Sequence, residues 1–328
     1  MCLKSLNTYG KKKELNEVMI YIYIYMFACC FHTNNQVNDI NDNKKESNDK
    51  QKIHCSQNVI KNKIKKIKKE LFKTKINNHI GYGISSNIFK IKLDNTYVSC
   101  KVIKDGWVEH SENEICVLKK ITNIDTFFVK YICNFNLSKK PVICYEYIDG
   151  TDLFTYISKD NTFLENENKT LELIRNILFG LEKLMELDLV HLDVKPENII
   201  IQCFDPLKIK IIDLAFCYNY KKRKIDSILG TIGYMAPEIV FHKKIYHNTD
   251  IWSIGIMIYL LYSNTFMFDC EEDAYVYNIT CDTRKNKLIE KNLQQCSVDL
   301  KMIITKCLMY NTNYRISVNG LIKLLNNI

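Results

Sequence analysis

The most constraining feature of this chain is the segment His191-Leu192-Asp193-Val194-Lys195-Pro196-Glu197-Asn198. It places a carboxylate, a lysine and a side-chain amide within one loop-sized stretch. A second carboxylate, Asp213, follows further along the chain, and Ala236-Pro237-Glu238 follows in turn. An isolated Asp-x-Lys-Pro-Glu-Asn segment can arise as the capped start of a helix. The interpretation therefore depends on which other motifs accompany it.

These residue types suit phosphoryl transfer, which needs positioning and stabilisation of the charge on several oxygens. We expect Asp193 to accept or orient the proton of the attacking hydroxyl, and Lys195 to lie beside the transferred group. Asn198 and Asp213 carry hard oxygen atoms that suit Mg²⁺. The loop alone thus predicts a catalytic pair and two metal ligands.

A glycine-containing stretch, His79 to Ile88, lies upstream between residues with strand propensity. Gly81 and Gly83 would let backbone N–H groups approach phosphates, although such a pair alone is more often a hairpin turn. Val98-Ser99-Cys100-Lys101 then resembles a short strand whose lysine would contact the α- and β-phosphates.

A helical pattern of apolar residues follows, with Glu114 at the border of its apolar face. We expect Glu114 to pair with Lys101, and Glu112 is the competing candidate.

Together, in this order, the motifs resemble the eukaryotic protein kinase family from about residue 74 to the C-terminus. The resemblance implies an α+β, bilobal fold, with ATP bound between a β-rich N-lobe and a mainly helical C-lobe. The implied divisions are an N-lobe at residues 74–147, a hinge at 146–151 and a C-lobe at 152–328.

The resemblance also implies how the nucleotide is held. Tyr145 would be a bulky gatekeeper, and Ile88 and Ser99 would cover the adenine with Ile200 beneath it. The full set implied for nucleotide binding is Gly81, Gly83, Ile88, Ser99, Lys101, Glu114, the hinge residues Glu146 and Ile148, Asp152 at the ribose, and Ile200.

Further landmarks of the family follow in the C-lobe. Residues 230–238 resemble the substrate-facing loop, residues 250–255 resemble the start of the central helix, and Arg315 matches an arginine that pairs with Glu238. Lys195 together with Thr231 resembles serine/threonine kinases, so the expected partners are proteins bearing serine or threonine.

The sequence departs from the family's pattern at the arginine of His-Arg-Asp, which is Leu192 here. Leu192 cannot grip a phosphate on Ser227, the residue at the usual phosphorylation position. We hypothesise that activity does not depend strongly on activation-loop phosphate. The basic run at residues 221–224 is either a solvated loop or a site for a substrate or a phosphate.

Two other departures are Ala215, where the family has the glycine of Asp-Phe-Gly, and Ser86, which replaces the last glycine of the phosphate loop. Neither removes a base or a metal ligand. The main alternative is a pseudokinase, a non-catalytic binding module. The intact set of Lys101, Glu114, Asp193, Asn198 and Asp213 favours catalysis.

Residues 1–55 form a low-complexity extension that we expect to be mostly disordered, with an apolar run at residues 18–31. That run is short for a membrane span but fits a signal-peptide core. Translation of an AT repeat is a third explanation. The default localisation is cytoplasmic, with a membrane or secretory route left open.

Residues 56–73 predict a basic amphipathic helix with Ile60, Ile64, Ile67 and Leu71 on one face. The chain has a net charge of +9, most of it in the first 72 residues. Packing on the N-lobe is the favoured role, and a membrane or an acidic partner is the alternative. Nucleic-acid binding is not expected.

The 14 cysteines and 7 histidines show no metal-ligand spacing, so we interpret the cysteines as reduced thiols. The physiological substrate, the regulator and the oligomeric state cannot be predicted from these patterns.

Overall fold

The computed structural model describes residues 49–73, 79–83, 85–122, 126–159, 167–268 and 282–327. These residues form two compact units. The smaller unit contains the described residues up to Val108 together with Ile132–Tyr147, and the larger contains Glu109–Tyr131 and the described residues from Ile148 onward.

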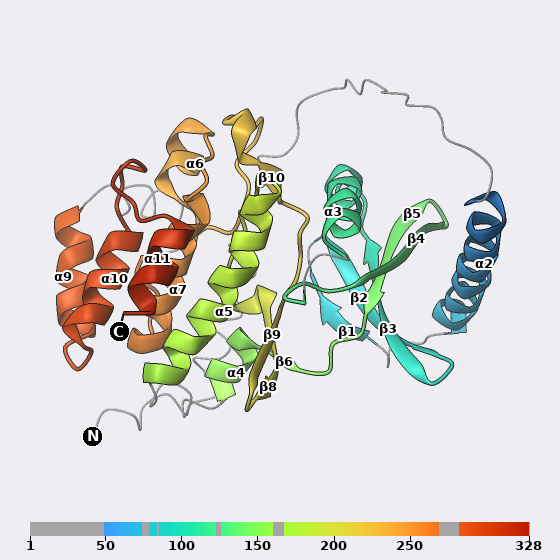
Figure 1. Cartoon of the computed structure of the whole chain (residues 1–328), viewed down its shortest axis with the longest axis horizontal. Coiled ribbons are helices and arrows are strands. Elements are labelled where there is room, and N and C mark those ends of the chain that lie inside the picture. Colours follow the sequence, from blue (N-terminus) through green and yellow to red (C-terminus); the bar gives the residue numbers. More distant parts are fainter. Residues whose placement is uncertain are drawn as a thin grey trace. The chain divides into compact units, whose positions relative to one another are not determined.

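The smaller unit is built on a five-stranded sheet (Figure 1) with the strand order β1-β2-β3-β5-β4. Strand pairs β1–β2, β2–β3 and β3–β5 are antiparallel. Alternating apolar residues give the sheet a buried face, as expected for half-covered antiparallel strands. The strands are β1 (His79–Tyr82), β2 (Ser86–Leu93), β3 (Thr96–Ile103), β4 (Tyr131–Leu137) and β5 (Lys140–Glu146).

Helix α2 (Asp49–Lys73) covers this core and begins earlier than the expected boundary at residue 56. Its Ile67 and Leu71 are buried in one cluster with side chains of the sheet, and Ile64 packs at the edge of that cluster. Ile60, which was expected on the same face, is 45% exposed. The apolar face is therefore shorter than predicted, and it packs on the sheet.

Two polar contacts support this packing at the edges of the helix. The Lys66 ammonium lies 2.8 Å from an Asp94 carboxylate oxygen, and the Lys68 ammonium lies 5.0 Å from the centre of the Phe135 ring. The Lys66–Asp94 pair is exposed, so we expect it to orient the helix more than to stabilise it. The buried Ile67 and Leu71 side chains account for most of the attachment.

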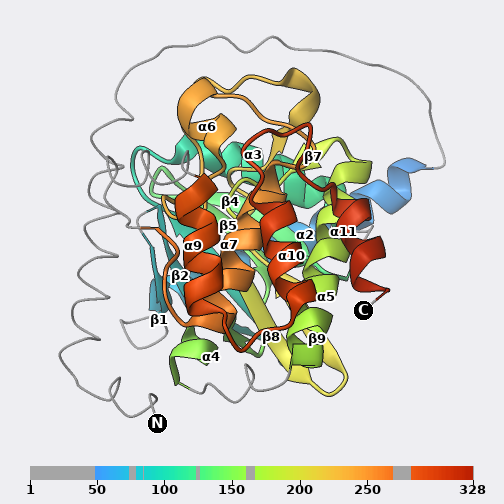
Figure 2. The ribbon, with the colours of Figure 1, turned by 90° about the vertical axis from the view of Figure 1, so that its left-hand side faces the viewer.

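The larger unit is mainly helical, so the expected α+β class is confirmed. Helix α7 is almost completely buried, and α10 packs directly against it, as α11 does against α5 (Figure 2). A Cβ atom at Gly255 would lie 2.7 Å from Cβ of Cys307, so the close approach of α7 and α10 requires a glycine. The helices are α3 (Val108–Ile121), α4 (Leu153–Lys159), α5 (Glu167–Glu186), α6 (Pro237–His242), α7 (Thr249–Ser263), α9 (Asp282–Asn292), α10 (Val298–Cys307) and α11 (Val318–Leu325).

Short strands and single-turn helices lie between the longer helices of the larger unit. Strands β6, β8 and β9 form one small sheet, and β7 pairs with β10 in another. Their bounds are β6 (Thr151–Asp152), β7 (Leu189–Val190), β8 (Ile199–Phe204), β9 (Leu207–Ile211), β10 (Tyr218–Asn219), η3 (Pro196–Asn198) and η4 (Tyr220–Lys222).

The N-lobe bounds of residues 74–147 stay a prediction; in the structure, Glu109–Tyr131 belongs to the larger unit. Backbone contacts explain this. The N–H of Ile211 donates to the carbonyl of Phe127 at 2.7 Å, and the Lys210 ammonium donates to the carbonyl of Phe128 at 2.9 Å. These bonds fasten the segment after α3 to strand β9.

Two expectations about the rest of the chain concern membranes and cysteines. Across the described ranges, no helix is both long and apolar enough to cross a bilayer, and the apolar run at 18–31 lies outside those ranges. The cysteines in these ranges carry free thiols, including Cys100 and Cys144, whose sulfur atoms lie 3.5 Å apart on neighbouring strands.

Replacing Ile67 with alanine tests the role of α2. The change should lower the free energy of unfolding by about 2–5 kcal/mol, because it leaves a cavity between helix and sheet. Urea unfolding would measure it, with the exposed Lys69→Ala as the matched control. Equal stability of the two variants would show that α2 does not contribute to the core of the smaller unit.

Candidate functional site

The segment His191–Asn198 forms a loop between β7 and β8, and a buried carboxylate holds its start. Asp250, in the first turn of α7, accepts hydrogen bonds from the backbone N–H groups of His191 at 2.7 Å and Leu192 at 2.8 Å. Burial raises the pKa of Asp250, while His191 and the two N–H donors oppose that rise. In the sequence, Asp250 marks only the start of a helix, so this long-range contact was not predicted.

The backbone at Leu192 has a φ of 65°, in the left-handed region that is unfavourable for a branched side chain. The two bonds to Asp250 hold the chain in this strained turn. Strain of this kind persists where surrounding contacts over-determine it, often at functional sites.

The His191 ring links two parts of the loop. Its Nε2 lies 3.2 Å from the carbonyl of Ile212, and its Nδ1 accepts from the N–H of Asp193 at 3.2 Å. This pattern places the proton on Nε2. The ring is completely buried, so His191 serves in packing and in hydrogen bonding within the loop.

Three donors surround the carboxylate of Asp193. The Thr231 hydroxyl donates to Oδ1 at 2.6 Å, and the side chains of Lys195 and Asn198 lie 3.0 Å from Oδ2. The Lys195 ammonium also donates to the Thr231 hydroxyl at 2.7 Å. The structure therefore brings the two predicted catalytic residues together and adds Thr231, which the sequence analysis used only as a sign of serine/threonine type.

The two predicted metal ligands lie on connected backbone. The N–H of Ile212, next to Asp213, donates to the carbonyl of Asn198 at 2.9 Å. The side-chain amide of Asn198 donates to the backbone carbonyl and to the carboxylate of Asp193. These bonds use the N–H groups of the amide and leave its carbonyl oxygen to bind a metal. One amide and one carboxylate suit a divalent ion that completes its shell with phosphate oxygens and water.

A metal site built from protein side chains alone would need a cluster of several ligating residues. Among the described residues, no group of three or more His, Cys, Asp or Glu could hold an ion. Asn198 and Asp213 stay the predicted metal ligands.

Glu197 lies next to this network without joining it. Both of its carboxylate oxygens are buried, and neither has a hydrogen-bond partner in the described part of the chain. Burial raises the pKa of Glu197, and the nearby Lys195 partly opposes that rise.

The segment after Asp213 is fastened to helix α3. The side-chain amide of Asn113 donates to the carbonyls of Ala215 at 2.9 Å and Cys217 at 2.8 Å. The left-handed residue here is Asp213, with a φ of 60°, and Ala215 has no positive φ. Glycine's freedom is therefore not needed at position 215, which explains why alanine is accepted there.

The loop at residues 230–238 is fixed at both ends. Gly230 has a φ of 115°, and a Cβ atom on it would lie 2.5 Å from the carbonyl oxygen of Leu192. At the other end, Arg315 binds both carboxylate oxygens of Glu238 at 2.6 and 2.8 Å, as predicted. Thr249 donates to the same carboxylate at 2.9 Å.

In the smaller unit, the predicted phosphate loop is a tight turn between β1 and β2. The N–H of Gly83 donates to the carbonyl of Ser86 at 2.9 Å, and Gly81 pairs with Ile88 across the strands. Ser86 is buried, so this departure from glycine fills space within the turn.

Strand β3 carries Ser99 and Lys101, both buried. Ser99 lies opposite Tyr145 of β5, and Lys101 lies between Ile88 and Ile143. The residues predicted to surround adenine in this unit, Glu146 included, thus come from neighbouring strands.

The other predicted nucleotide residues belong to the larger unit. Ile200 of β8 lies opposite Asp152 of β6, and Glu114 is buried on α3. The Asp152 carboxylate accepts from the N–H of Thr155 at 2.7 Å and so caps α4. Ile148 is buried at the boundary of the unit. Since Lys101 and Glu114 fall in different units, their pairing stays a prediction.

The buried pair Arg315–Glu238 gives a stability prediction. Replacing Arg315 with methionine should lower the free energy of unfolding by about 3–5 kcal/mol, because it leaves a buried carboxylate without its cation. The double variant with Glu238→Leu should recover part of that loss, and denaturant unfolding would compare the two. A double variant at least as unstable as the sum of both single changes would contradict this account.

Comparison with known proteins shows which family this chain resembles. The protein kinase domain family matches residues 74–324. Myosin light chain kinase family member 4 is 30% identical over 234 residues in Homo sapiens, covering 71% of this chain and 59% of the relative, and 30% identical over 230 residues in Mus musculus, covering 69% and 58%. Myosin light chain kinase 3 of Rattus norvegicus is 29% identical over 246 residues, covering 74% of this chain and 29% of the relative.

This chain thus spans about three fifths of the first two relatives. The predicted resemblance is confirmed, because the matched range contains the whole network around Asp193. A domain of this kind implies ATP and a divalent metal. The chain therefore belongs to the protein kinase family, of the serine/threonine type.

Proposed function

We propose that this chain is an active kinase that transfers the γ-phosphoryl group of ATP to serine or threonine hydroxyls of proteins. The observation that carries the proposal is the ring of donors around Asp193. A carboxylate held by Thr231, Lys195 and Asn198 has one fixed orientation, which a general base or a proton-orienting group requires.

In this reaction the substrate hydroxyl oxygen forms a bond to the γ-phosphorus, and the bond from that phosphorus to the bridging oxygen breaks, which releases ADP. The hydroxyl proton passes to the carboxylate of Asp193. Lys195 lies 3.0 Å from that carboxylate, so its positive charge is also close to the oxygens that carry charge in the transition state.

Mg²⁺ is the metal that we propose, because Asn198 and Asp213 offer hard oxygen ligands. When bound, it would neutralise charge on the phosphate oxygens. The family resemblance implies that Lys101, which is buried on β3, contacts the α- and β-phosphates of ATP.

Changing Asp193 to asparagine and Lys101 to methionine tests the activity. Each change should lower phosphate transfer from ATP and magnesium to generic serine/threonine substrates by about 100-fold or more, because the first removes the carboxylate that accepts the hydroxyl proton and the second removes the cation expected at the phosphates of ATP. Intact mass and radiolabel transfer would measure it. A folded wild type that binds ATP and transfers no phosphate would instead support a non-catalytic binding module.

We also propose that the activation segment, which runs from Asp213 to Glu238, needs no phosphate to hold its shape. Leu192 is buried and apolar, and Ser227 is exposed. The segment is fixed by contacts of its own. The N–H of Ile225 donates to the carbonyl of Lys243 at 3.0 Å, and the N–H of Ile245 donates to the carbonyl of Arg223 at 3.1 Å.

Burial strengthens this short ladder, because the side chains of Ile225 and Ile245 are both buried. With Asn113 at the start of the segment and Thr231 near its end, the backbone is held at three places. An arginine–phosphate contact would add a further anchor to a segment that is already anchored.

Ser227→Ala therefore should retain turnover within about twofold of the wild type. Thr231→Val, in the same segment, should lower turnover by about tenfold or more, because it removes a donor to Asp193. Steady-state kinetics at saturating ATP would measure both. A Ser227→Ala enzyme as impaired as Thr231→Val would overturn the proposal.

A further inference from the structure

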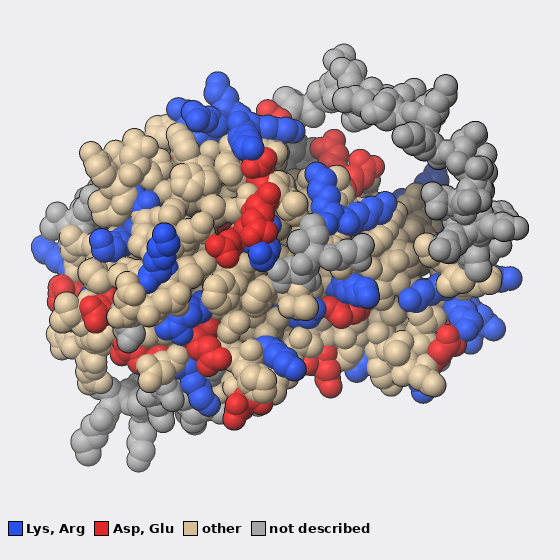
Figure 3. Space-filling view, in the orientation of Figure 1, with Lys and Arg blue, Asp and Glu red and all other residues tan. Residues whose placement is uncertain are grey.

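A dense group of cations covers the part of the larger unit around η4 and the end of α6. Figure 3 shows their side chains gathered on one surface. All of them are exposed. We define this basic patch as Lys221, Lys222, Arg223, Lys224, Lys243 and Lys244.

The backbone brings the two halves of the basic patch together. Lys224 lies opposite Lys244 in an antiparallel bridge, flanked by the ladder bonds of Ile225 and Ile245. Arg223 and Lys243 both have left-handed backbone, with φ of 60° and 48°, so each segment turns sharply at the patch. The cations are therefore held in place by buried neighbours and main-chain bonds.

Only some of the cations in the basic patch contact other residues of the chain. Lys221 pairs with Asp188 at 2.7 Å, Lys222 lies 5.5 Å from the centre of the Tyr218 ring, and Lys243 donates to the carbonyl of Asp226 at 3.2 Å. The side chains of Arg223, Lys224 and Lys244 have no partner in the part of the chain that the structure describes.

The pairing of Lys224 with Lys244 is informative because like charges directly opposite each other destabilise a strand pair. A bound anion would relieve that repulsion. A surface with several uncompensated cations also attracts acidic partners from a distance.

The basic patch and Asp193 belong to one continuous segment. The chain runs from Lys224 through Ile225, which is buried, to Gly230 against the carbonyl of Leu192 and then to Thr231 at the carboxylate of Asp193. A protein whose hydroxyl reaches Asp193 would have neighbouring residues available to this surface. This connection favours a protein substrate over a nucleic acid.

We propose that the basic patch binds a run of aspartate and glutamate residues in the protein substrate, close in sequence to the accepting hydroxyl. This proposal rests on the proposed kinase function, because the bound protein is a substrate only if the chain phosphorylates it. The binding of an acidic peptide to the patch does not depend on catalysis.

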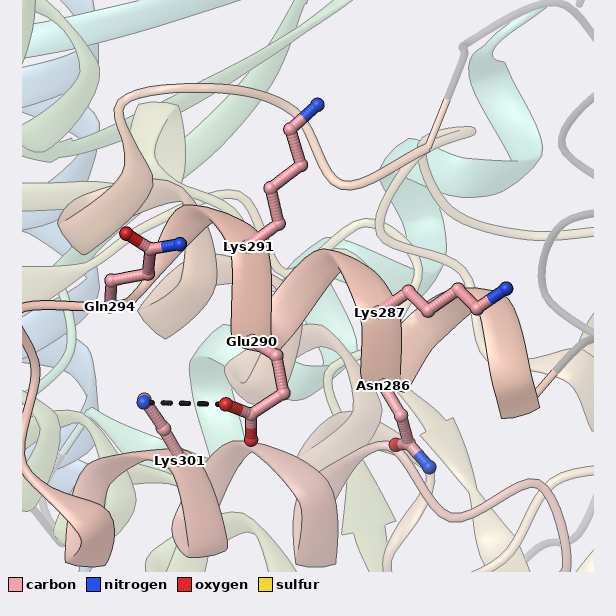
Figure 4. A pocket seen from close by; sticks show the side chains of 6 residues that line it. All are labelled: Asn286, Lys287, Glu290, Lys291, Gln294 and Lys301. Atoms are coloured by element: carbon pink, nitrogen blue, oxygen red, sulfur yellow. Dashed lines mark ion pairs between the residues drawn. The ribbon is translucent and has the colours of Figure 1, made fainter.

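A second basic surface is a weaker candidate. A shallow, open pocket between α9 and α10 is lined by Lys287, Lys291 and Lys301 together with Glu290 and two amide side chains. In Figure 4, Lys301 points toward Glu290, with which it pairs at 3.5 Å, and Lys287 and Lys291 extend in different directions. Its cations do not converge, so it serves as the control surface.

The test uses the full chain with Arg223→Asn, Lys224→Gln and Lys244→Gln, since asparagine tolerates the left-handed backbone at residue 223. The matched control is Lys287→Gln, Lys291→Gln and Lys306→Gln, which removes as many exposed cations from the same unit. The probe is a labelled peptide with an Asp/Glu run beside an alanine in place of the acceptor, and fluorescence anisotropy without ATP measures its binding.

We expect the patch variant to bind the acidic peptide about tenfold more weakly than the wild type, with a smaller dependence on salt. The control variant should bind as the wild type does, and a peptide with Asn and Gln in place of the acids should not distinguish the three proteins. Equal binding by patch variant and wild type would overturn the proposal, and so would a loss confined to the control. Tighter binding of a single-stranded oligonucleotide than of the peptide, lost in the patch variant, would also overturn it.

Kinetic measurements distinguish a failure of the proposed binding site from a failure of the proposed kinase activity. With serine peptides, the patch variant should raise KM for the acidic peptide about tenfold and leave kcat within about twofold. Acidic-peptide binding that depends on the patch, together with no phosphorylation of any peptide, would refute the kinase activity and retain the binding site. Phosphorylation without any preference for the acidic peptide would refute the patch alone.

Discussion

The hydrogen bonds from the backbone of His191 and Leu192 to the buried carboxylate of Asp250 are the interaction on which the rest of the site depends. They hold Leu192 in a left-handed conformation, and the carbonyl of the same residue lies against Gly230. From this point the loop turns so that Asp193 meets Thr231, Lys195 and Asn198. A buried helix, α7, thereby sets the geometry of an otherwise irregular segment.

The same logic extends to the activation segment. Where an arginine would grip a phosphate, this chain has a buried leucine. The segment is held instead by main-chain pairing with residues 243–245, by two buried isoleucines and by Asn113 of α3. Contacts of this kind are present whenever the chain is folded, whereas a phosphate anchor exists only after modification. These contacts support our proposal that activity does not depend strongly on activation-loop phosphate.

In an activation segment that needs no phosphate, as we propose, the cations stay available to a partner. In the basic patch, Arg223, Lys224 and Lys244 remain without a side-chain partner in the described ranges. The main-chain ladder of Ile225 and Ile245 also sets Lys224 opposite Lys244. One local structure thus links the two proposals, for the activation segment and for the basic patch.

Much of the site could be predicted from the sequence, because its main residues are close in the chain. Asp193, Lys195 and Asn198 lie within one loop, and the bidentate pair of Arg315 with Glu238 followed from the family resemblance. The contacts of Asp250 and Asn113 could not be predicted, because each joins elements far apart in sequence and no local pattern encodes it.

Other details depend on the backbone conformation and on packing. The sequence shows that alanine replaces the family's glycine at position 215, but only the backbone conformation reveals that the left-handed residue is Asp213. The apolar period at Ile60 predicted burial, yet that side chain is 45% exposed.

The most direct test of the central claim measures turnover of enzyme that carries no phosphate. The purified full chain would be treated with phosphatase, its intact mass would confirm that no phosphate remains, and initial rates would be taken before any is regained. The account predicts that the unphosphorylated enzyme turns over at a rate close to that of the untreated enzyme. An inactive unphosphorylated enzyme, reactivated as its mass gains a phosphate, would contradict it.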